Sequence, residues 1–209
     1  ATTVELVTQK VYRVPNYRTK LNLIQYLLED EETFSRVIIF VKTKEHAEEV
    51  FKVIKRKAEG EKRILHSNKG QNSRINAINA FKNGEISVLI ATDIAARGID
   101  IDKLPVVINF DLPRSPADYM HRIGRSGRAG EAGLAVTLIS HEDYHHFGVI
   151  EKKNKLKLVR EQIVGFEADD EMPAELLEQA KPVAKPEGMG KKKRKQLPPA
   201  NAEFWGKKS

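Results

Sequence analysis

Short apolar runs of strand length alternate with amphipathic helix patterns along most of the chain, and this alternation restricts the fold more than any other feature. Residues 36–41 (RVIIFV), 86–91 (ISVLIA), 106–110 (VVINF) and 134–139 (LAVTLI) are typical of parallel strands buried on both faces. Strands joined through helices favour right-handed crossovers and a sheet covered by two helical layers. We therefore predict an α/β fold with a mostly parallel central sheet. In such sheets, binding sites gather at the carboxyl ends of the strands.

Further segments complete this pattern. The remaining expected strands are an exposed strand at residues 4–14 and a short strand at residues 63–66, and the expected helices cover residues 20–28, 71–81, 116–123 and 143–153, with one more starting after Thr43. Ser115 is a suitable N-cap for the helix that starts at Pro116, where proline fits the first turn. Helical spacing predicts that Ile75, Ile78 and Phe81 face the core.

The charge distribution divides the chain into three parts. We assign residues 1–165 to one globular domain, residues 166–180 to an acidic linker and residues 181–209 to a disordered tail rich in Pro, Gly and Lys. The tail has nine basic and two acidic residues, while the rest of the chain is balanced. The tail is therefore expected to tether a nucleic acid. Two alternatives are a nuclear address at KKKRK and a protein-docking peptide at Phe204 and Trp205.

Composition excludes several classes of protein. The chain has no cysteine, which excludes a disulfide framework and thiolate metal sites and suits a reducing, cytoplasmic location. No apolar run approaches the roughly 18 residues of a membrane span, so we expect no membrane partner. The six histidines lack zinc-site spacing, so we expect no metal bound by this chain. The first residue is Ala rather than Met, and we expect that an N-terminal part is missing.

The segment HRIGRSGRAG (residues 121–130) places Arg122, Arg125 and Arg128 three residues apart, with glycines in the same rhythm. Guanidinium groups are always charged and their forked shape suits phosphate oxygens. The alternative is a solvated basic helix face. However, each glycine would cost an ordinary helix about 1 kcal/mol relative to alanine. The pattern therefore favours a polyphosphate-binding segment.

Two other segments are candidates for ligand binding. In ATDIAARGID (residues 91–100), the Thr92 hydroxyl could hold a phosphate and Asp100 could accept hydrogen bonds from sugar hydroxyls. The alternative is a plain strand-to-helix connection capped by Asp93. In HSNKGQNSR (residues 66–74), Gln71 and Arg74 lie three apart at a helix start and can face one ligand, although an ordinary turn explains the segment equally well.

A G-x-x-x-x-G-K-[ST] phosphate loop is absent, and no Asp-Glu pair stands at a strand end to hold Mg²⁺. The chain thus has arginines for stabilising phosphate charge without the groups that bind a triphosphate. This combination describes half of an active site. An arginine supplied across an interface can accelerate phosphoryl transfer by about 10³–10⁵.

At these residues the sequence resembles the C-terminal RecA-like domain of a DEAD-box RNA helicase. The resemblance covers about residues 11–164, and four segments match family motifs in order: VIIFVKTK, QNSR, ATDIAARGID and YMHRIGRSGRAG. It implies a RecA-like three-layer sandwich. The turn HSNK resembles the bacterial RhlE-like subgroup, and Ser67 departs from the glycine common at that place.

The resemblance also implies roles for matching positions. Arg125 and Arg128 would be arginine fingers on the γ-phosphate, and His121 would contact the magnesium-side motifs of the missing domain. Asp100 would bind the ribose of ATP. Thr92, Gly70 and Arg74 would contact RNA phosphates. Arg97 and Phe40 would lie between the two motor domains, with Phe40 packed under the arginines.

The function implied by the resemblance is that of the second motor domain of an ATP-dependent RNA helicase, an ATP hydrolase that separates short duplexes. Its partners would be RNA and the N-terminal RecA-like domain of the same full-length chain, which would hold Mg²⁺ for the ATP. The fragment alone is then expected to be inactive. Two alternatives stay open: a motor of the same superfamily acting on DNA, and a free-standing RNA-binding or annealing module without an ATP role.

Overall fold

The computed structural model describes residues 3–55, 61–65, 70–98, 106–126 and 132–168. The strands are β1 (Val7–Arg13), β2 (Val37–Val41), β3 (Glu61–Leu65), β4 (Ile86–Thr92), β5 (Val106–Asn109), β6 (Gly133–Ile139) and β7 (Arg160–Glu161). The helices are α1 (Tyr17–Leu27), α2 (Lys44–Ile54), α3 (Gln71–Lys82), α4 (Asp93–Ala96), α5 (Pro116–Ile123) and α6 (Tyr144–Lys153), with short 3₁₀ turns η1 (Thr3–Leu6) and η2 (His141–Asp143).

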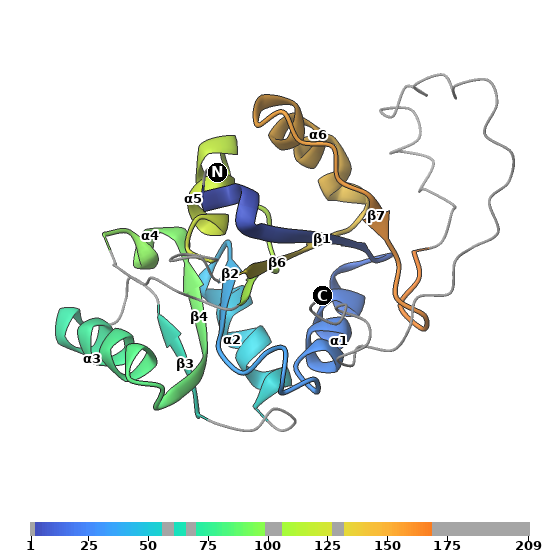
Figure 1. Cartoon of the computed structure of the whole chain (residues 1–209). Helices are drawn as coiled ribbons and strands as arrows, with labels where there is room; N and C mark the ends of the chain where they lie inside the picture. Colours follow the sequence, from blue (N-terminus) through green and yellow to red (C-terminus); the bar gives the residue numbers. More distant parts are fainter. Residues whose placement is uncertain (1–2, 56–60, 66–69, 99–105, 127–131, 169–209) are drawn as a thin grey trace, which may run out of the picture.

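The strands form one sheet in the order β3-β4-β2-β5-β6-β1-β7, and neighbouring strands run parallel (Figure 1). Helices cover both faces, so the predicted three-layer α/β architecture is confirmed. The central strand β2 is buried along its whole length, as expected for a parallel strand between two helical layers.

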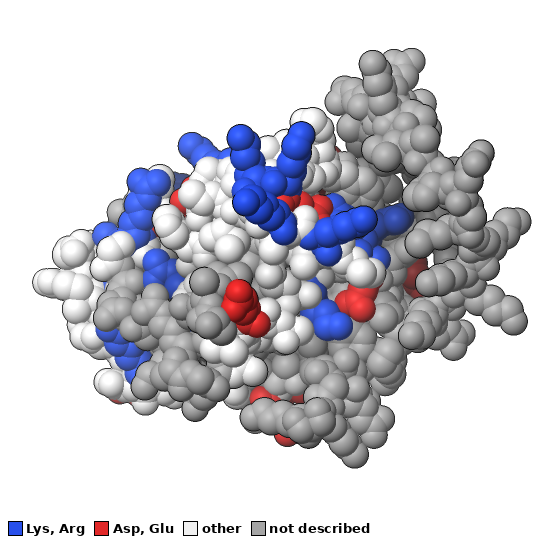
Figure 2. All heavy atoms as spheres, turned by 45° about the horizontal axis from the view of Figure 1, so that its top comes forward, with Lys and Arg blue, Asp and Glu red and all other residues white. Residues whose placement is uncertain are grey.

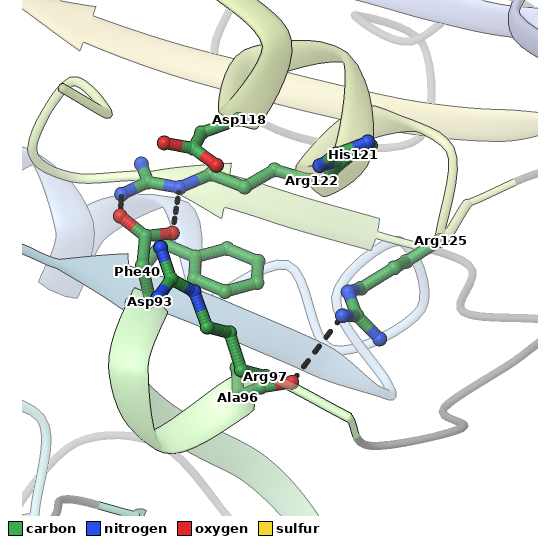
Figure 3. A pocket seen from close by; sticks show the side chains of 8 residues that line it. All are labelled: Phe40, Asp93, Ala96, Arg97, Asp118, His121, Arg122 and Arg125. Atoms are coloured by element: carbon green, nitrogen blue, oxygen red, sulfur yellow. Dashed lines mark hydrogen bonds and ion pairs between the residues drawn. The ribbon is translucent and has the colours of Figure 1, made fainter. Parts of the chain in front are cut away.

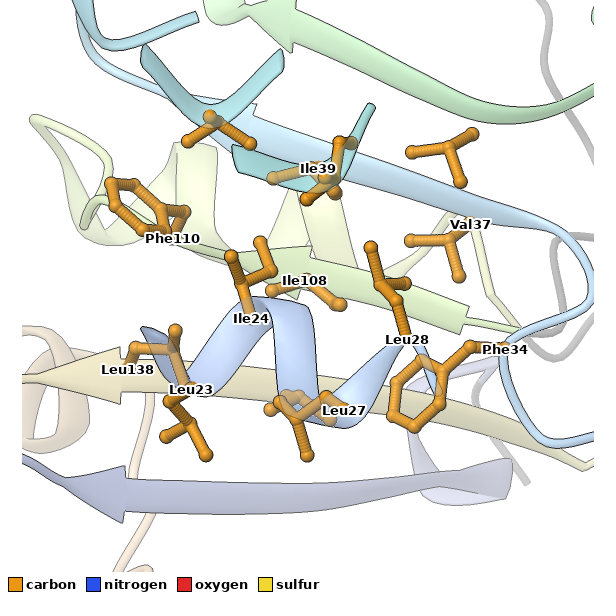
Figure 4. Close-up of a cluster of buried hydrophobic side chains, with 14 of the residues drawn as sticks. Leu23, Ile24, Leu27, Leu28, Phe34, Val37, Ile39, Ile108, Phe110 and Leu138 are labelled. Atoms are coloured by element: carbon orange, nitrogen blue, oxygen red, sulfur yellow. The ribbon is translucent and has the colours of Figure 1, made fainter. Parts of the chain in front are cut away.

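Alternate residues of β2 supply two separate cores. Val37, Ile39 and Val41 pack with the apolar side chains of α1 and α2. Figure 4 shows the α1 part of this core, where leucines and an isoleucine of the helix lie against the sheet. Ile38 and Phe40 point to the other face, where they pack with α3 and α4. Phe40 therefore leaves β2 on the side where α4 and α5 meet.

Local capping explains where the helices begin. The Thr43 hydroxyl accepts a hydrogen bond from the His46 N–H, as the sequence predicts for α2. Ser115 caps α5 in the same way, with Pro116 in the first turn. Helix α1 begins before the predicted residue 20, because the Asn16 side chain accepts from the Thr19 N–H and starts the helix at Tyr17.

Strand β1 is not exposed, contrary to the sequence-based expectation. It lies between β6 and β7, and Val11 and Tyr12 are fully buried. Its polar residues are satisfied by distant partners: Gln9 accepts from the Tyr119 hydroxyl, and Lys10 forms an ion pair with Glu161 of β7. The two-residue strand β7 was not predicted, because a segment that short has no readable alternation.

One predicted core residue is also placed differently. Ile75 is 45% exposed, whereas Phe81 is fully buried and Ile78 is partly buried against the core. The inner face of α3 is set by Ala77 and Phe81. Ile75 lies two residues, or about 200° around the helix, from Ala77 and so points outward.

Packing continues past the predicted domain end at residue 165. The Phe166 ring lies 5.2 Å from that of Tyr26, and Ala168 is buried. The rest of the predicted linker and the tail, residues 169–209, lie outside the described residues. Within the described ranges, none of the helices combines the length and the hydrophobicity needed to cross a bilayer.

Candidate functional site

A small pocket lies where β2 and β4 end, between α4 and α5. Its lining residues are Phe40, Asp93, Ala96, Arg97, Asp118, His121, Arg122 and Arg125 (Figure 3). The pocket measures about 80 Å³. Sites that enclose a small ligand usually measure about 300–1,000 Å³. The described residues therefore do not enclose a site of that size by themselves, and we refer to the lining residues as the pocket wall.

Arg122, the first of the three periodic arginines, is part of the framework of this wall. It is 2% exposed, and its guanidinium binds both carboxylate oxygens of Asp93, at 2.7 Å and 2.5 Å. It also donates to the backbone carbonyl of Asp111 (2.7 Å) and to the side chain of Asn109 (3.2 Å). These contacts fix α5 to the ends of β4 and β5.

The ring of Phe40 lies beneath this ion pair. The Arg122 guanidinium carbon is 4.8 Å from the centre of the Phe40 ring, in cation–π geometry. The end of β2 therefore supports the same side chain that joins α4 to α5. The sequence pattern placed Arg122 in a phosphate-binding segment with Arg125 and Arg128, but its guanidinium is buried and engaged by Asp93, Asp111 and Asn109.

Arg125 lies on the other side of the turn that ends α5. Its Nη2 donates to the Ala96 carbonyl at 3.3 Å, and its half-buried guanidinium lines the pocket (Figure 3). Between the two arginines lies Gly124, where an added Cβ would meet the Met120 carbonyl at 3.1 Å. The glycine therefore allows the chain to turn tightly after the helix and present Arg125 to the pocket.

Two further basic side chains lie at the rim. His121, in the last turn of α5, and Arg97, directly after α4, are both exposed and both line the pocket. Gly98 follows with a φ of +70°, a conformation that glycine adopts without strain. The pocket lining thus presents the guanidinium groups of Arg97 and Arg125 beside the His121 ring, and guanidinium groups suit phosphate oxygens.

A second edge of the sheet brings together the residues predicted to touch RNA phosphates. The Thr92 hydroxyl accepts from the Ala95 N–H and caps α4, while Arg74 donates to the Ala95 carbonyl at 2.7 Å. Gly70 is the exposed N-cap residue of α3, one turn before Arg74. Thr92 and Arg74 therefore meet at Ala95 of α4, and Gly70 lies one helical turn before Arg74. The cap of α4 is Thr92, and the suggestion that Asp93 caps this helix is wrong.

Asp111, at the end of β5, connects this wall to the opposite helical layer. Its carboxylate lies 2.7 Å from His46 Nδ1 and accepts from the Lys42 N–H at 2.9 Å. Burial acts to raise the pKa of this carboxyl group, but the hydrogen bonds from His46 and Lys42 outweigh it, and the pKa is lowered below its ordinary value. Asp111 therefore stabilises the fold as a carboxylate.

This shift predicts a pH dependence of stability. A depressed folded-state pKa contributes stability that is complete above the unfolded-state pKa and is lost as the pH falls through the folded-state value. We expect Asp111→Asn to reduce the loss of unfolding free energy seen on acidification below about pH 4. Urea unfolding at several pH values measures this slope. An unchanged slope would show that other carboxyl groups dominate acid unfolding.

Two predicted site residues, Asp100 and Arg128, lie outside the described residues. In the parts of the chain that the structure describes, no group of three or more His, Asp or Glu side chains could hold a metal ion. The sequence analysis did not identify Asp93 as a residue of the pocket wall. An acidic residue directly after a buried strand, in a chain with an arginine-rich segment, could have indicated an ion pair between the two.

Comparisons with known proteins agree with this geometry. Residues 19–130 match the family described as the helicase conserved C-terminal domain. The structure of the C-terminal domain of the DEAD-box protein Dbp5 aligns with a TM-score of 0.70 and 32% identity, over 76% of this chain and 92% of that one. The chain belongs to the DEAD-box helicase family. It is a C-terminal RecA-like domain of that family.

Other relatives support the same assignment of this DEAD-box domain. The E. coli DEAD-box protein SrmB, solved bound to regulator of ribonuclease activity A, aligns with a TM-score of 0.69 and 32% identity, over 79% of this chain and 98% of that one. The ATP-dependent RNA helicase SrmB of Haemophilus influenzae is 38% identical over 167 residues, 80% of this chain and 38% of that protein. CshA of Geobacillus kaustophilus is 36% identical over 73% of this chain and 32% of its own length. This DEAD-box domain thus spans less than two-fifths of these curated relatives.

The family assignment leaves finer predictions open. Membership of the RhlE-like subgroup, the domain boundaries and the individual roles of His121, Arg97, Arg125 and the RNA-edge residues of this DEAD-box domain stay predictions. What the structure adds is their arrangement. Helix α4 contributes Asp93 and Ala96 to the pocket wall, and its Ala95 binds Thr92 and Arg74. A displacement of α4 would therefore alter both groups of residues.

Proposed function

We propose that the chain is the second motor domain of an ATP-dependent RNA helicase. In this role it supplies Arg125 and Arg128 to the γ-phosphate of ATP, and Asp100 to the ribose. Its RNA surface is formed by Thr92, Gly70 and Arg74. The N-terminal RecA-like domain of the full-length protein holds the rest of the nucleotide and its Mg²⁺.

The observation that carries this proposal is that Arg122 and Arg125, from the same segment, have different environments. Arg122 is held in a buried ion pair with Asp93, while Arg125 lines an open pocket beside the exposed His121. The pocket has basic side chains but a volume of only about 80 Å³, which is too small to enclose a nucleotide. This is what we expect if a second domain covers the nucleotide from the other side. The bound ATP supplies the phosphoryl group for hydrolysis. Arg125 and Arg128 stabilise the charge that develops on it.

The RNA part of the proposal rests on the α3 and α4 edge. Thr92 and Arg74 converge on Ala95, and Gly70 leaves the start of α3 open to a phosphate. Contacts of this kind hold the backbone rather than the bases, so they provide little sequence preference. Closure of the two domains on RNA and ATP would then favour a bent strand and separate a short duplex locally.

The isolated 209-residue chain is expected to show negligible ATP hydrolysis, because one wall of basic side chains lacks a phosphate loop and a Mg²⁺ site. Phosphate release measured with and without RNA tests this. Joined to an N-terminal DEAD-box domain, the same chain is expected to hydrolyse ATP and to unwind a short RNA duplex. Robust turnover by the isolated chain would overturn the half-site proposal.

The same assay separates the alternatives. A free-standing annealing module would bind RNA in the two-domain protein without any ATP-dependent unwinding. A DNA-directed motor would unwind a DNA duplex of the same sequence faster than the RNA duplex. A cytoplasmic location stays a prediction from composition.

A further inference from the structure

A second concentration of positive charge lies at the end of α6, outside the pocket wall and the RNA edge. Residues 152–160 (KKNKLKLVR) contain five basic residues and no acidic one. Arg160 is neutralised by Glu151, which binds its guanidinium. The four remaining lysines form what we term the lysine surface, Lys152, Lys153, Lys155 and Lys157, and all four are exposed. None of them forms an ion pair with another residue among those that the structure describes.

The segment after α6 turns these lysines outward in a regular way. Leu156 and Leu158 pack inward against the core formed with α5 and α6, while Lys155 and Lys157 point to solvent. Lys155 and Lys157 therefore lie on the solvent side of this segment, and Lys152 and Lys153 continue the exposed row in the last turn of α6. Figure 2 shows basic side chains gathered over the region of α5 and α6.

This segment is held firmly rather than left loose. The Glu151 carbonyl accepts from the Leu156 N–H, and its buried carboxylate accepts from the Leu158 N–H at 2.8 Å. The Asn154 side chain donates to the Pro116 carbonyl at the start of α5. The lysine surface is thus attached to α5 at Pro116, a residue that does not line the pocket.

The backbone at Lys155 is an independent observation. Its φ of +54° lies in the left-handed region, where glycine or asparagine avoids strain and a lysine does not. Glycine would make the turn after α6 at less cost. A strained position that keeps a charged side chain points to a role for the charge, since the turn itself does not need lysine.

We propose that the lysine surface binds the phosphate backbone of RNA, as a site separate from the pocket and from the α3–α4 edge. The choice of RNA as the polyanion rests on the proposed function. Exposed lysines without acidic partners act as flexible point charges, and they bind phosphates without reading bases. The surface would hold a flanking part of a bound RNA and would raise affinity without altering sequence preference.

The test compares two triple variants of the full chain with equal net charge. One is Lys153→Gln/Lys155→Gln/Lys157→Gln. The control is Lys52→Gln/Lys55→Gln/Lys82→Gln, which removes exposed lysines in α2, directly after α2 and at the end of α3. The dissociation constant for a labelled 20-nucleotide single-stranded RNA is measured between 50 and 300 mM KCl. Each phosphate contact contributes about −0.7 to the salt slope, so the first variant should lower its magnitude by about 2 and weaken binding on the order of 100-fold at 0.1 M salt.

Lys155→Gly separates charge from structure. It should weaken RNA binding about 5-fold at 0.1 M salt, because one phosphate contact is lost. It should leave the urea midpoint unchanged or raised, because the backbone strain is relieved. The triple variant with arginine in place of glutamine should restore the salt slope. A structural role of the segment would lower stability and RNA affinity together, which would contradict the proposal.

The remaining outcomes also decide the proposal. Equal salt slopes for the glutamine variant and its control would overturn it. Unchanged RNA binding with lost ATP hydrolysis in the two-domain protein would overturn it in favour of a contact between the two motor domains. A lowered slope in a protein that neither hydrolyses ATP nor unwinds RNA would support the lysine surface and reject the proposed motor function.

Discussion

Arg125→Ala in the two-domain protein is expected to slow ATP hydrolysis by about 10³-fold or more while the fold is retained. Arginines that stabilise a transferring phosphoryl group contribute about 10³–10⁵ to the rate. Arg125 lines the open pocket and is half-buried, and its hydrogen bond to the Ala96 carbonyl is long. Urea unfolding of the same variant checks that the fold is retained. Steady-state phosphate release, with RNA at saturation, measures the rate.

Two matched variants make this result specific. Arg114→Ala removes an exposed arginine just before α5, outside the pocket, and should leave the rate within about 3-fold. Arg125→Lys keeps the charge but loses the forked donor geometry, so an intermediate rate is expected. Turnover by Arg125→Ala equal to that of Arg114→Ala would remove the assigned role and leave the pocket without its central cation.

The elements that sequence could predict are those specified locally. Ser115 and Thr43 cap helices as expected because the cap is decided within four residues. The run at residues 37–41 is a buried strand because parallel strands between two helical layers need apolar residues on both faces. Family motifs in order then predicted the fold and the motor-domain class.

The features that sequence could not predict depend on distant partners. Strand β1 was expected to be exposed because Gln9 and Lys10 are polar, yet Tyr119 and Glu161 satisfy both. The inner face of α3 was misassigned at Ile75 because its apolar positions do not follow one stripe. The first error comes from contacts far apart in sequence, which local periodicity does not contain. The second comes from a helix whose apolar residues are spread around its axis.

The arginine segment is the clearest case of this limit. Its period of three makes Arg122 and Arg125 look equivalent, and a short helix followed by a turn at Gly124 separates them. One arginine then meets Asp93 and the other meets the pocket. Because Asp93 comes from the β4–α4 junction, only the folded arrangement decides which arginine is available to a ligand.

Asp93→Ala is expected to lower the free energy of unfolding by about 3–5 kcal/mol, because it leaves the Arg122 guanidinium buried without its counter-ion. Arg122→Leu is expected to have a smaller effect on the free energy of unfolding, because the Asp93 side chain that it leaves unpaired is 29% exposed and can be hydrated. Arg122→Leu therefore costs chiefly the donors to Asp111 and Asn109. Once Asp93 is alanine, adding Arg122→Leu should cost little more, because the leucine removes the unpaired charge and keeps an apolar contact with Phe40.

Urea unfolding of the two single variants and the double variant gives this coupling directly, and we expect at least about 2 kcal/mol of interaction free energy. Glu48→Ala, an exposed acidic residue of α2, is the control and should change stability by less than about 0.5 kcal/mol. Additive effects of Asp93→Ala and Arg122→Leu would show that the ion pair does not hold α5 in place. If the two effects are coupled, the ion pair that stabilises the domain also holds α5 in the position from which Arg125 faces the pocket. Arg125 can then meet a ligand only while Arg122 is bound to Asp93.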